Sequence, residues 1–431
     1  MEKINDSGIN MNRHEMIKEL AQESPTYNYA MREFIPGITQ VLYSGPYWDN
    51  REMELALEAL LTGKWITSGE YVARFQGRFA QRFNVKHAHM VNSGSSANLI
   101  MLSALKKRHG WKDGGEIVVS PVGFPTTIAP IVQIGLVPRF VDIEMDTLNF
   151  ELDDVHSAAC RDECVGIFVS PVLGNPPDMD RLTRFSNMLI GDNCDSLGSK
   201  WGSRYLNEYY EAWSTSFYPA HHICTGEGGM VCSNDDELIK TARSMSWWGR
   251  DCYCVGQANL LSCGTCGQRF SKWIEDQEEM DHKYLFTNIG YNLKPLDLQG
   301  AIGLAQLEKL SKIESLRREN YKKISEIFSS KVRVAHTLPK ADPCWFGVPL
   351  ICDSAEKKRS LVNHLESNKI QTRPYFAGNI LNHPGYKHLG QADKFPNANK
   401  VASTVFFVGC PPHYNDEVIG YIADVVKKWN G

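Results

Sequence analysis

The chain has 431 residues, of which 42% are hydrophobic and 22% are charged, and its formal net charge at pH 7 is −4. This is the composition of a globular protein long enough for two domains. The charge gives no general attraction to nucleic acid or to an anionic membrane. No segment approaches the roughly 18 apolar residues of a membrane span, and the N-terminus lacks the apolar core of a secretion signal. We therefore expect a cytoplasmic protein.

Apolar runs and helical patterns alternate through the first part of the chain. In chain order they are a helix at 95–110, a strand at 116–122, a helix at 126–135, and strands at 137–143, 164–172 and 188–193. Short continuous apolar runs of this kind are typical of buried parallel strands. The alternation predicts a doubly wound α/β domain over residues 50–310, preceded by an N-terminal arm over 1–49.

The last third of the chain has a different pattern. Apolar residues at helical spacing over 298–328 predict a long helix that leaves the α/β domain. Strand-like segments at 344–352 and 404–411 lie on either side of a helical pattern at 354–368. These elements predict a smaller α+β domain over residues 311–431.

Three features of the α/β region point to a ligand. The sequence Asn92–Ser96 lies between an apolar lead and a helix. Backbone N–H groups at a helix N-terminus, with small hydroxyl side chains, suit a phosphate, although a Ser-rich helix cap has the same sequence. Asp192 follows an apolar run at the carboxyl end of a predicted strand, where α/β folds gather ligands. An aspartate there can keep a pyridinium nitrogen protonated, and Phe124, which also follows a strand, can stack on such a ring.

Five segments in order carry a resemblance to a known family: "NSGSSANL", "GFPTT", "GDNCDSLGS", "SFYPAHH" followed by "GEGG", and "GYNLKPLDLQGAIGLAQLEKL". Together they resemble the sugar aminotransferase family of fold type I pyridoxal-phosphate enzymes. Within that family the chain is similar to the branch with histidine in place of the cofactor lysine, the CDP-4-keto-6-deoxyglucose 3-dehydrases. The resemblance runs from about residue 50 to the C-terminus. It implies an α/β cofactor domain with a smaller C-terminal domain, and a homodimer with its active site at the subunit interface.

The resemblance also implies which residues hold the phosphate of the cofactor. They are Gly94, Ser95, Ser96 and Ser216 of one subunit, together with Asn292, which would reach the phosphate held by the partner subunit. We treat this set as the predicted phosphate site.

The remaining predicted site residues surround the reactive part of the cofactor. By the resemblance, Phe124 stacks on the ring and Asp192 contacts the ring nitrogen. His221 occupies the position of the lysine. Asp195 and Tyr218 are further catalytic candidates, although Asp195 can equally cap the turn that follows it.

Histidine at the lysine position changes the expected chemistry. An imidazole cannot form the Schiff base through which lysine holds the cofactor aldehyde, but it is a competent base near neutral pH. The chain is therefore expected to hold pyridoxamine 5'-phosphate (PMP) noncovalently. His221 would remove a proton from the methylene carbon of PMP after the amine has condensed with a 4-keto sugar. Loss of the sugar's 3-hydroxyl would then replace amination.

Four of the twelve cysteines lie within fifteen residues: Cys252, Cys254, Cys263 and Cys266. In a chain without an export signal, clustered thiols indicate metal or redox chemistry. The resemblance implies a [2Fe–2S] cluster with Cys194, Cys252 and Cys254 as three of its ligands. For the fourth, Cys263 lies one residue beyond the spacing of the family and Cys266 lies four beyond, so we favour Cys263. An extended backbone would put Cys194 about 7 Å from Asp192, on the same side. A structural zinc site would accept the same four thiols.

Three functional classes follow from these patterns. The favoured class is a PMP- and [2Fe–2S]-dependent nucleotide-sugar 3-dehydrase. No Gly-x-Gly-x-x-Gly fingerprint follows a strand, so its electrons would come from a separate reductase, an NADH-dependent flavin iron–sulfur protein. The second class is a PMP dehydratase that uses glutamate and no cluster, and the third is a non-catalytic pyridoxal-binding regulator. The sequence does not distinguish CDP, TDP and GDP sugars. Arg373 is a candidate for a diphosphate contact, and equally an ordinary surface arginine.

Overall fold

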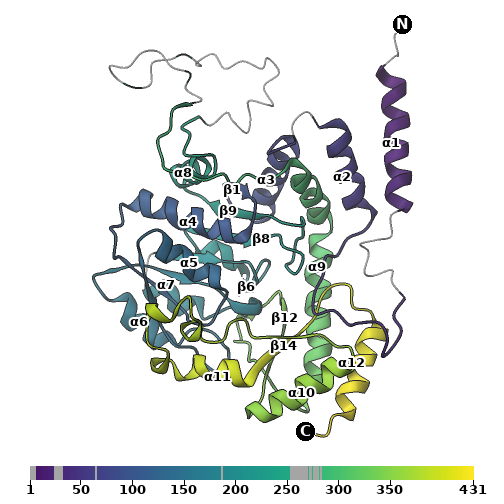
Figure 1. Cartoon of the computed structure of the whole chain (residues 1–431), viewed down its shortest axis with the longest axis vertical. Coiled ribbons are helices and arrows are strands. Elements are labelled where there is room, and N and C mark those ends of the chain that lie inside the picture. The colour runs from purple at the N-terminus through teal and green to yellow at the C-terminus, as the bar shows by residue number, and fades with distance from the viewer. Residues whose placement is uncertain are drawn as a thin grey trace.

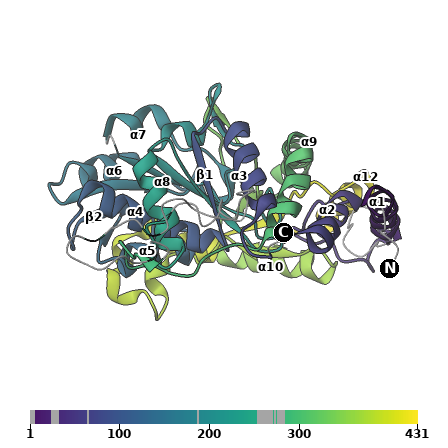
Figure 2. The same ribbon diagram turned by 90° about the horizontal axis from the view of Figure 1, so that it is seen from above.

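The computed structural model describes residues 6–23, 33–63, 66–185, 188–252, 270, 274, 281 and 284–431. Figures 1 and 2 show one large sheet with helices on both faces, and the long helix α9 leads from it to a smaller sheet. None of the helices in these segments combines the length and the apolar character that crossing a lipid bilayer requires.

The large sheet has seven strands in the order β1-β9-β8-β5-β4-β2-β3. Their bounds are β1 His87–Val91, β9 Gly229–Ser233, β8 Ala212–Ser216, β5 Leu189–Asp192, β4 Cys164–Val169, β2 Glu116–Val119 and β3 Val137–Phe140. The neighbouring strands from β8 to β3 pair in parallel, whereas β9 is antiparallel to both β1 and β8. All four strands that the apolar runs predicted are therefore confirmed, and their carboxyl ends meet at one edge of the sheet.

Helices cover both faces of this sheet because each buries one apolar side against it. One face carries α4 (Gly94–His109), α5 (Pro125–Gln133) and α8 (Asp236–Ser246), whose apolar residues share one core with the strands. The other face carries α3 (Glu70–Arg82), α6 (Leu152–Ala159), α7 (Met179–Phe185) and the first half of α9 (Asp297–Ser329). The helices predicted at 95–110 and 126–135 are α4 and α5, and the long helix predicted at 298–328 is α9.

The beginning of α4 is fixed by local hydrogen bonds. Ser93 is its N-cap, and the Ser93 hydroxyl accepts the backbone N–H of Ser96 at 3.1 Å. The helix ends at Gly110, which has a φ of 64°, a left-handed conformation that glycine adopts at little cost. This places the free N–H groups of the first turn of α4 at the carboxyl edge of the sheet.

The smaller sheet has four antiparallel strands in the order β10-β12-β14-β13. They are β10 Arg333–Val334, β12 Gly347–Ile351, β14 Val405–Gly409 and β13 Thr372–Pro374. Helices α10 (Ala355–Ser367), α11 (Pro396–Thr404) and α12 (Asp416–Lys428) and the end of α9 pack against it in a separate core. The two strands and the helix predicted for this region are confirmed as β12, β14 and α10.

The segment before residue 50 contacts the smaller sheet region. Val41 is buried in the core of that region and forms a bridge with Ile370. Helices α1 (Asp6–Glu23) and α2 (Asn50–Thr62) lie on the same side of the molecule (Figure 1), and a small sheet of β6 (Lys200–Trp201), β7 (Arg204–Tyr205) and β11 (Ala341–Asp342) joins distant parts of the chain. The boundary near residue 310 falls inside α9, and the three-part division of the chain remains our proposal.

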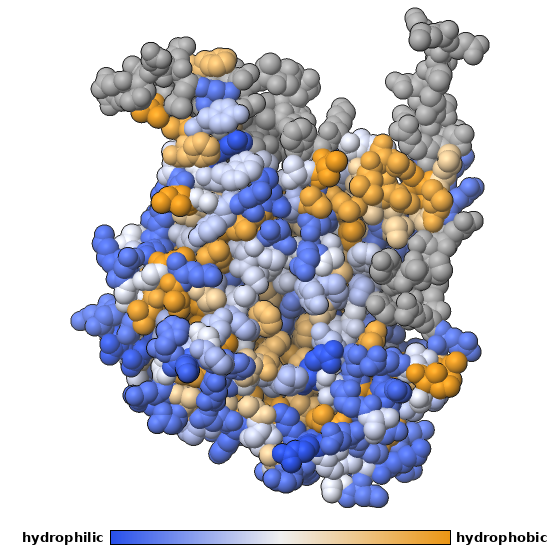
Figure 3. Space-filling model, in the orientation of Figure 1, coloured by the Kyte–Doolittle hydropathy of each residue, from blue (hydrophilic) through white to orange (hydrophobic). Residues whose placement is uncertain are grey.

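An apolar patch is exposed over the end of the molecule that carries α2 (Figure 3). Leu60 and Leu61 of α2 are exposed, as are Ile66 and Leu296. The last two lie close together, because the N–H of Asp297 donates to the carbonyl of Ile66 at 2.8 Å. Exposed apolar groups of this kind are typical of surfaces that contact another protein.

Candidate active site

A cavity of about 310 Å³ opens at the carboxyl ends of the parallel strands. Its wall contains residues from the ends of β5 and β8, from the first turns of α4 and α5, and from the segment that leads into β12. A larger depression of about 610 Å³ beside Tyr321, Ser329 and His336 contains none of the predicted site residues. The 310 Å³ cavity is therefore the candidate active site.

Most of the predicted phosphate site lies at one end of this cavity. Gly94, Ser95 and Ser216 line the wall. A Cβ on Gly94 would lie 2.5 Å from the Cβ of Ser216, so only glycine allows the start of α4 to approach the end of β8 this closely. The hydroxyl of Ser96 instead donates to Asn92 Oδ1 at 2.7 Å. The free N–H groups of α4 and these small side chains fit a phosphate.

Asp192 is held in place by several hydrogen bonds. Its Oδ2 accepts from Asn98 Nδ2 at 2.9 Å and from Thr127 Oγ1 at 2.7 Å. Asn98 also donates to the carbonyl of Thr126 at 3.0 Å and accepts from Ser214 Oγ at 2.5 Å. Asn98, Thr127 and Ser214 are all buried. The carboxylate of Asp192 therefore stands on the cavity wall in a fixed orientation, as a contact to a pyridinium nitrogen requires.

Cys194 does not lie on an extended strand, contrary to our expectation. Strand β5 ends at Asp192, and Cys194 lies in the turn that follows. The reason is local: Asp192 Oδ1 accepts the backbone N–H of Cys194 at 3.3 Å, a side-chain contact that favours a turn. Cys194 nevertheless lines the same cavity as Asp192.

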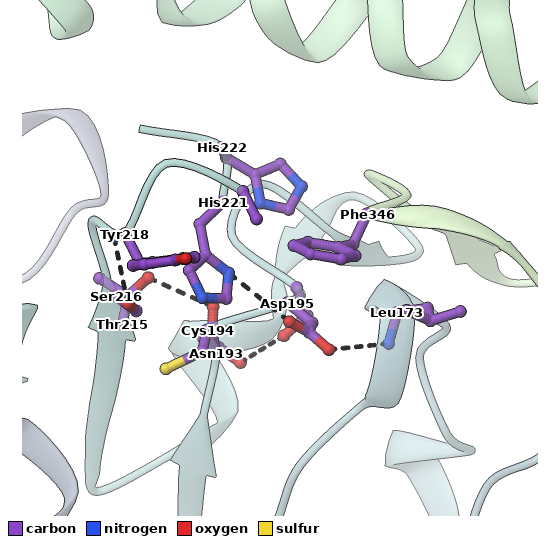
Figure 4. Close-up of polar contacts among 12 residues, drawn as sticks. Leu173, Asn193, Cys194, Asp195, Thr215, Ser216, Tyr218, His221, His222 and Phe346 are labelled. Atoms are coloured by element: carbon purple, nitrogen blue, oxygen red, sulfur yellow. Dashed lines mark hydrogen bonds and ion pairs between the residues drawn. The ribbon is translucent and has the colours of Figure 1, made fainter. Parts of the chain in front are cut away.

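The three predicted catalytic residues meet at the other end of the cavity (Figure 4). Figure 4 shows His221 between Tyr218 and Asp195, and the Nδ1 atom of His221 lies 3.5 Å from Asp195 Oδ1. Among the described residues, this Nδ1 has no hydrogen-bond partner. Asp195 Oδ2 accepts the N–H of Leu173 at 3.1 Å, so Asp195 is bonded to the 3-10 turn Val172–Gly174 that follows β4.

The neighbouring His222 is turned away from the cavity. It is 2% exposed, its Nε2 lies 2.7 Å from the carbonyl oxygen of Cys344, and it is absent from the cavity wall. Of the two adjacent histidines, only His221 therefore faces the candidate site.

Burial shifts the pKa values of His221 and Asp195. It lowers the pKa of His221 to about 4, with the charge of Arg317 acting in the same direction and that of Asp192 against it. Burial raises the pKa of the Asp195 carboxyl to about 7. The hydrogen bond from Leu173 lowers this pKa, and the charge of Asp192 raises it further. At pH 7 the imidazole is therefore neutral, the form in which it can accept a proton.

Aromatic rings form another part of the wall. Phe124 and Tyr218 both line the cavity and are about half exposed. Phe124 contacts Phe376 edge to face, at 6.2 Å between ring centres. The ring of Phe346 packs against the imidazole of His221 at 5.3 Å. Phe124 is thus free on one side to contact a planar ligand.

Two predicted contacts lie away from the cavity wall within this chain. Asn292 is exposed, pairs with Trp247 and accepts a hydrogen bond from Lys294. Its contact with a partner's phosphate stays a prediction. Arg373 is half-buried on β13, and its guanidinium lies 4.1 Å from the ring centre of Tyr43, which lines the cavity.

The predicted cluster ligands are only partly described. Burial raises the pKa of the Cys194 thiol well above its ordinary value, and the carboxylates of Asp192 and Asp195 add to this effect. Cys252 is half-buried at the end of the segment that follows α8, while Cys254 and Cys263 lie outside the described residues. Within the described part of the chain, no three His, Cys, Asp or Glu side chains are grouped as metal ligands. The four thiols fit a [2Fe–2S] cluster by their chemistry.

Several residues of the wall were missed by sequence reasoning. Thr126 and Thr127 belong to the segment "GFPTT", where only Phe124 was singled out, so a signal was available. Tyr43 and Phe346 come from distant parts of the chain and carry no signal, because an isolated aromatic residue is far more often part of a core.

Comparison with known proteins agrees with this architecture. The family model of the DegT/DnrJ/EryC1/StrS aminotransferases matches residues 48–427. The dTDP-4-dehydro-2,6-dideoxy-D-glucose 3-dehydratase of Saccharopolyspora spinosa is 37% identical over 423 residues, 95% of this chain and 89% of that protein.

Two solved structures extend the comparison. The GDP-4-keto-6-deoxy-D-mannose-3-dehydratase of E. coli with bound hydrated PLP has a TM-score of 0.79 at 29% identity, covering 90% of this chain and 99% of that one. A structure of GDP-4-keto-6-deoxymannose-3-dehydratase with a trapped PLP-glutamate geminal diamine has a TM-score of 0.78 at 28% identity, with coverages of 90% and 100%. The chain has the fold of the pyridoxal-phosphate-dependent sugar aminotransferases and belongs to the DegT/DnrJ/EryC1/StrS aminotransferase family.

Proposed function

We propose that the chain is a PMP-dependent 3-dehydratase of a 4-keto-6-deoxy nucleotide sugar, with the CDP sugar as the first candidate substrate. The observation that carries this proposal is the presence of His221 on the wall of the cavity that contains Asp192, a wall in which no lysine is found among the described residues. The relatives named above as sugar 3-dehydratases support the same reaction class. A non-catalytic pyridoxal-binding regulator would need the contacts to the cofactor but no base at the position of His221.

In this proposal some residues of the chain bind the cofactor and others take part in the reaction. The start of α4 binds the phosphate, Asp192 contacts the ring nitrogen, and Phe124 packs on the ring. When bound, PMP supplies the amine that condenses with the sugar ketone and a ring that accepts electrons. His221 takes the proton from the methylene carbon, and Tyr218 and Asp195 surround the place where the 3-hydroxyl leaves.

We further propose that Cys194, Cys252, Cys254 and Cys263 hold a [2Fe–2S] cluster, which would transfer single electrons. Replacing the C3 hydroxyl by hydrogen releases water and consumes two electrons and two protons. One NADH and one proton supply these through a separate flavin iron–sulfur reductase. The position of Cys194 beside Asp192 supports this proposal, because electron transfer requires the cluster to lie near the cofactor.

Two proposals concern the surroundings of the enzyme. The exposed apolar patch of Leu60, Leu61, Ile66 and Leu296 supports a homodimer. Asn292 would then contribute to the site of the partner subunit. We propose that the enzyme works in the cytoplasm, where NADH and nucleotide sugars are available.

A second candidate function is a 3-dehydratase that uses glutamate instead of a cluster. The relative with a trapped PLP-glutamate geminal diamine favours it. The two candidates differ in the need for iron, NADH and the clustered cysteines.

The substrate assay tests the reaction class. Protein loaded with PMP is incubated with the CDP, dTDP and GDP forms of 4-keto-6-deoxyglucose and the GDP form of 4-keto-6-deoxymannose, and loss of the 3-hydroxyl is followed by mass spectrometry. We expect water loss from one nucleotide form. Transfer of the PMP amino group to the sugar, without loss of the hydroxyl, would contradict the proposal.

Metal analysis and a cysteine variant separate the two candidates. Anaerobically purified protein should contain iron and sulfide and absorb visible light beyond the cofactor band. Cys252→Ser should leave water loss intact and abolish NADH-dependent reduction, with Cys160→Ser as a control on an exposed cysteine outside the proposed set. Zinc without iron, or full turnover with glutamate in Cys252→Ser, would exclude the cluster.

A further inference from the structure

Arg317 is a buried cation at the centre of the molecule. It lies on α9, and its side chain is among the largest that are fully buried, with the residue 1% exposed. Its Nη1 donates to the carbonyls of Trp345 and Phe346, both at 3.2 Å. Its Nη2 donates to the carbonyls of Ala220 and His221 at 3.3 and 3.2 Å. One side chain therefore joins two segments that are more than 100 residues apart.

No carboxylate of the described residues hydrogen-bonds to this guanidinium. All four of its hydrogen-bond partners in the described part of the chain are backbone carbonyls, and its Nε has no partner there. The carboxylate of Asp195 acts on this charge without a hydrogen bond. Burying a charge without a carboxylate in hydrogen-bond contact is costly, and an apolar side chain of similar size would avoid that cost. The charge at this position therefore calls for a reason other than packing.

The two joined segments carry the two rings that meet at the reactive end of the cavity. The carbonyls of His221 and Phe346 each accept a hydrogen bond from Arg317, and the rings of the two residues pack against each other at 5.3 Å. On the opposite side, the Nδ1 atom of His221 approaches Asp195 Oδ1 at 3.5 Å, and the imidazole also hydrogen-bonds to the backbone of Cys194. The planar guanidinium, with donors at fixed angles, is suited to setting the distance between two backbone segments.

We propose that Arg317 is a positioning residue that holds the His221 segment against Phe346 and so sets where the imidazole stands in the cavity. This inference rests on the proposed function, because it assigns the position of the residue we propose as the base. Arg317 itself does not line the cavity, so it acts through His221.

Kinetics of Arg317→Lys and Arg317→Met are the first test. A lysine keeps the charge but places its donors on one nitrogen, which cannot span both pairs of carbonyls. A displacement of about 1 Å at a reacting group can reduce the rate by about 100-fold. We expect kcat to fall by about this factor in Arg317→Met and by less in Arg317→Lys, while KM for the sugar and the affinity for PMP stay close to wild type.

Arg318→Met is the matched control. Arg318 is the next residue on α9, and it bonds to Asp342 at 2.9 Å and to the carbonyl of Gly198 at 3.0 Å, away from His221. It should keep the wild-type kcat. Addition of guanidinium ion to Arg317→Ala should restore part of the lost rate, which a general loss of stability would not allow.

The second readout does not depend on catalysis. In His221→Lys, the introduced amine should capture pyridoxal phosphate, and borohydride should fix the label at residue 221. In His221→Lys combined with Arg317→Met, capture should be several-fold slower, while Arg318→Met should not change it. If the single variant captures no cofactor, the proposed function fails; if it captures and the double variant does so equally fast, the role of Arg317 fails.

Folding is checked by thermal unfolding of each variant. If Arg317→Met does not fold, the inference is tested by the kcat of Arg317→Lys and by the recovery of the rate when guanidinium is added to Arg317→Ala. Wild-type kcat and wild-type capture in the folded Arg317→Lys, with no effect of guanidinium on Arg317→Ala, would overturn the inference.

Discussion

The two ends of the cavity differ in how completely their polar groups are hydrogen-bonded. At the end formed by α4 and β5, Asp192 accepts three hydrogen bonds, and Asn98 is in turn held by its own partners. At the other end, the Nδ1 atom of His221 has no hydrogen-bond partner in the described part of the chain, and Asp195 is 3.5 Å away. Buried polar groups are nearly always satisfied, so an unsatisfied one in the wall of a cavity is available to a bound ligand. We infer that the first end holds a ligand in place and that the second is left open for a reacting group.

We expect the largest effect on rate from a substitution of His221, at the end of the cavity that is left open for a reacting group. His221→Asn removes the proposed base, so exchange of the PMP methylene protons with deuterated water should slow by about 10²- to 10⁴-fold. The exchange is followed by NMR of the bound cofactor. His222→Asn is the control, because His222 bonds to the carbonyl of Cys344 away from the cavity. Slow exchange in His222→Asn with normal exchange in His221→Asn would reverse the assignment.

At the end formed by α4 and β5, we expect a substitution to weaken the binding of PMP. Asp192→Asn replaces the carboxylate with a neutral amide, and a hydrogen bond to a charged group contributes about 1.5–3 kcal/mol. Affinity for PMP, measured by equilibrium dialysis, should therefore fall by about 10- to 100-fold. Asp195→Asn should slow methylene exchange without this loss of affinity. Equal effects of the two variants on both quantities would remove the distinction between the two ends.

Substitution of a residue that hydrogen-bonds to Asp192 should reduce PMP affinity less than substitution of Asp192 itself. Asn98→Ala removes one of the donors that orient the carboxylate, so PMP affinity should fall by about 10-fold. Ser103→Ala is the control on the same helix, because the Ser103 hydroxyl donates only to the carbonyl of Leu99. If both variants weaken PMP binding alike, the loss reflects a disturbed α4 rather than the orientation of Asp192.

We expect the smallest effect on PMP affinity from Ser95, and none from its neighbour Ser96. Ser95 lines the cavity, where its hydroxyl donates to Thr126 Oγ1 at 3.0 Å, whereas the hydroxyl of Ser96 is bonded to Asn92. Loss of one neutral hydrogen bond is worth about 1 kcal/mol, or about fivefold in affinity. Ser95→Ala should weaken PMP binding by this amount, while Ser96→Ala should lower only the melting temperature. A larger binding loss in Ser96→Ala would return Ser96 to the phosphate site.

Much of the fold follows from local sequence patterns. The strands predicted at 116–122 and 188–193 are confirmed, because buried parallel strands are continuous apolar runs. Asp192 and Phe124 were found by the same reasoning, since each follows such a strand. The turn at Cys194 was not foreseen, because the hydrogen bond from its N–H to Asp192 is invisible in an apolar pattern.

The reactive end depended on contacts between distant segments. His221 was singled out only through the resemblance to a family, and the roles of Phe346 and Arg317 emerged only once α9 and β12 were seen beside it. Long-range contacts of this kind have no periodicity and no spacing rule. The ligand set of the proposed cluster was likewise named from the resemblance, and Cys254 and Cys263 lie outside the described residues.

The most direct test of the account is a crystal structure of the protein with PMP. We predict that the phosphate lies at the start of α4, that the ring nitrogen contacts Asp192, and that the methylene carbon lies within reach of the imidazole of His221. A cofactor bound in the reverse orientation, or one whose methylene carbon faces away from His221, would contradict the division of the cavity into a holding end and a reacting end.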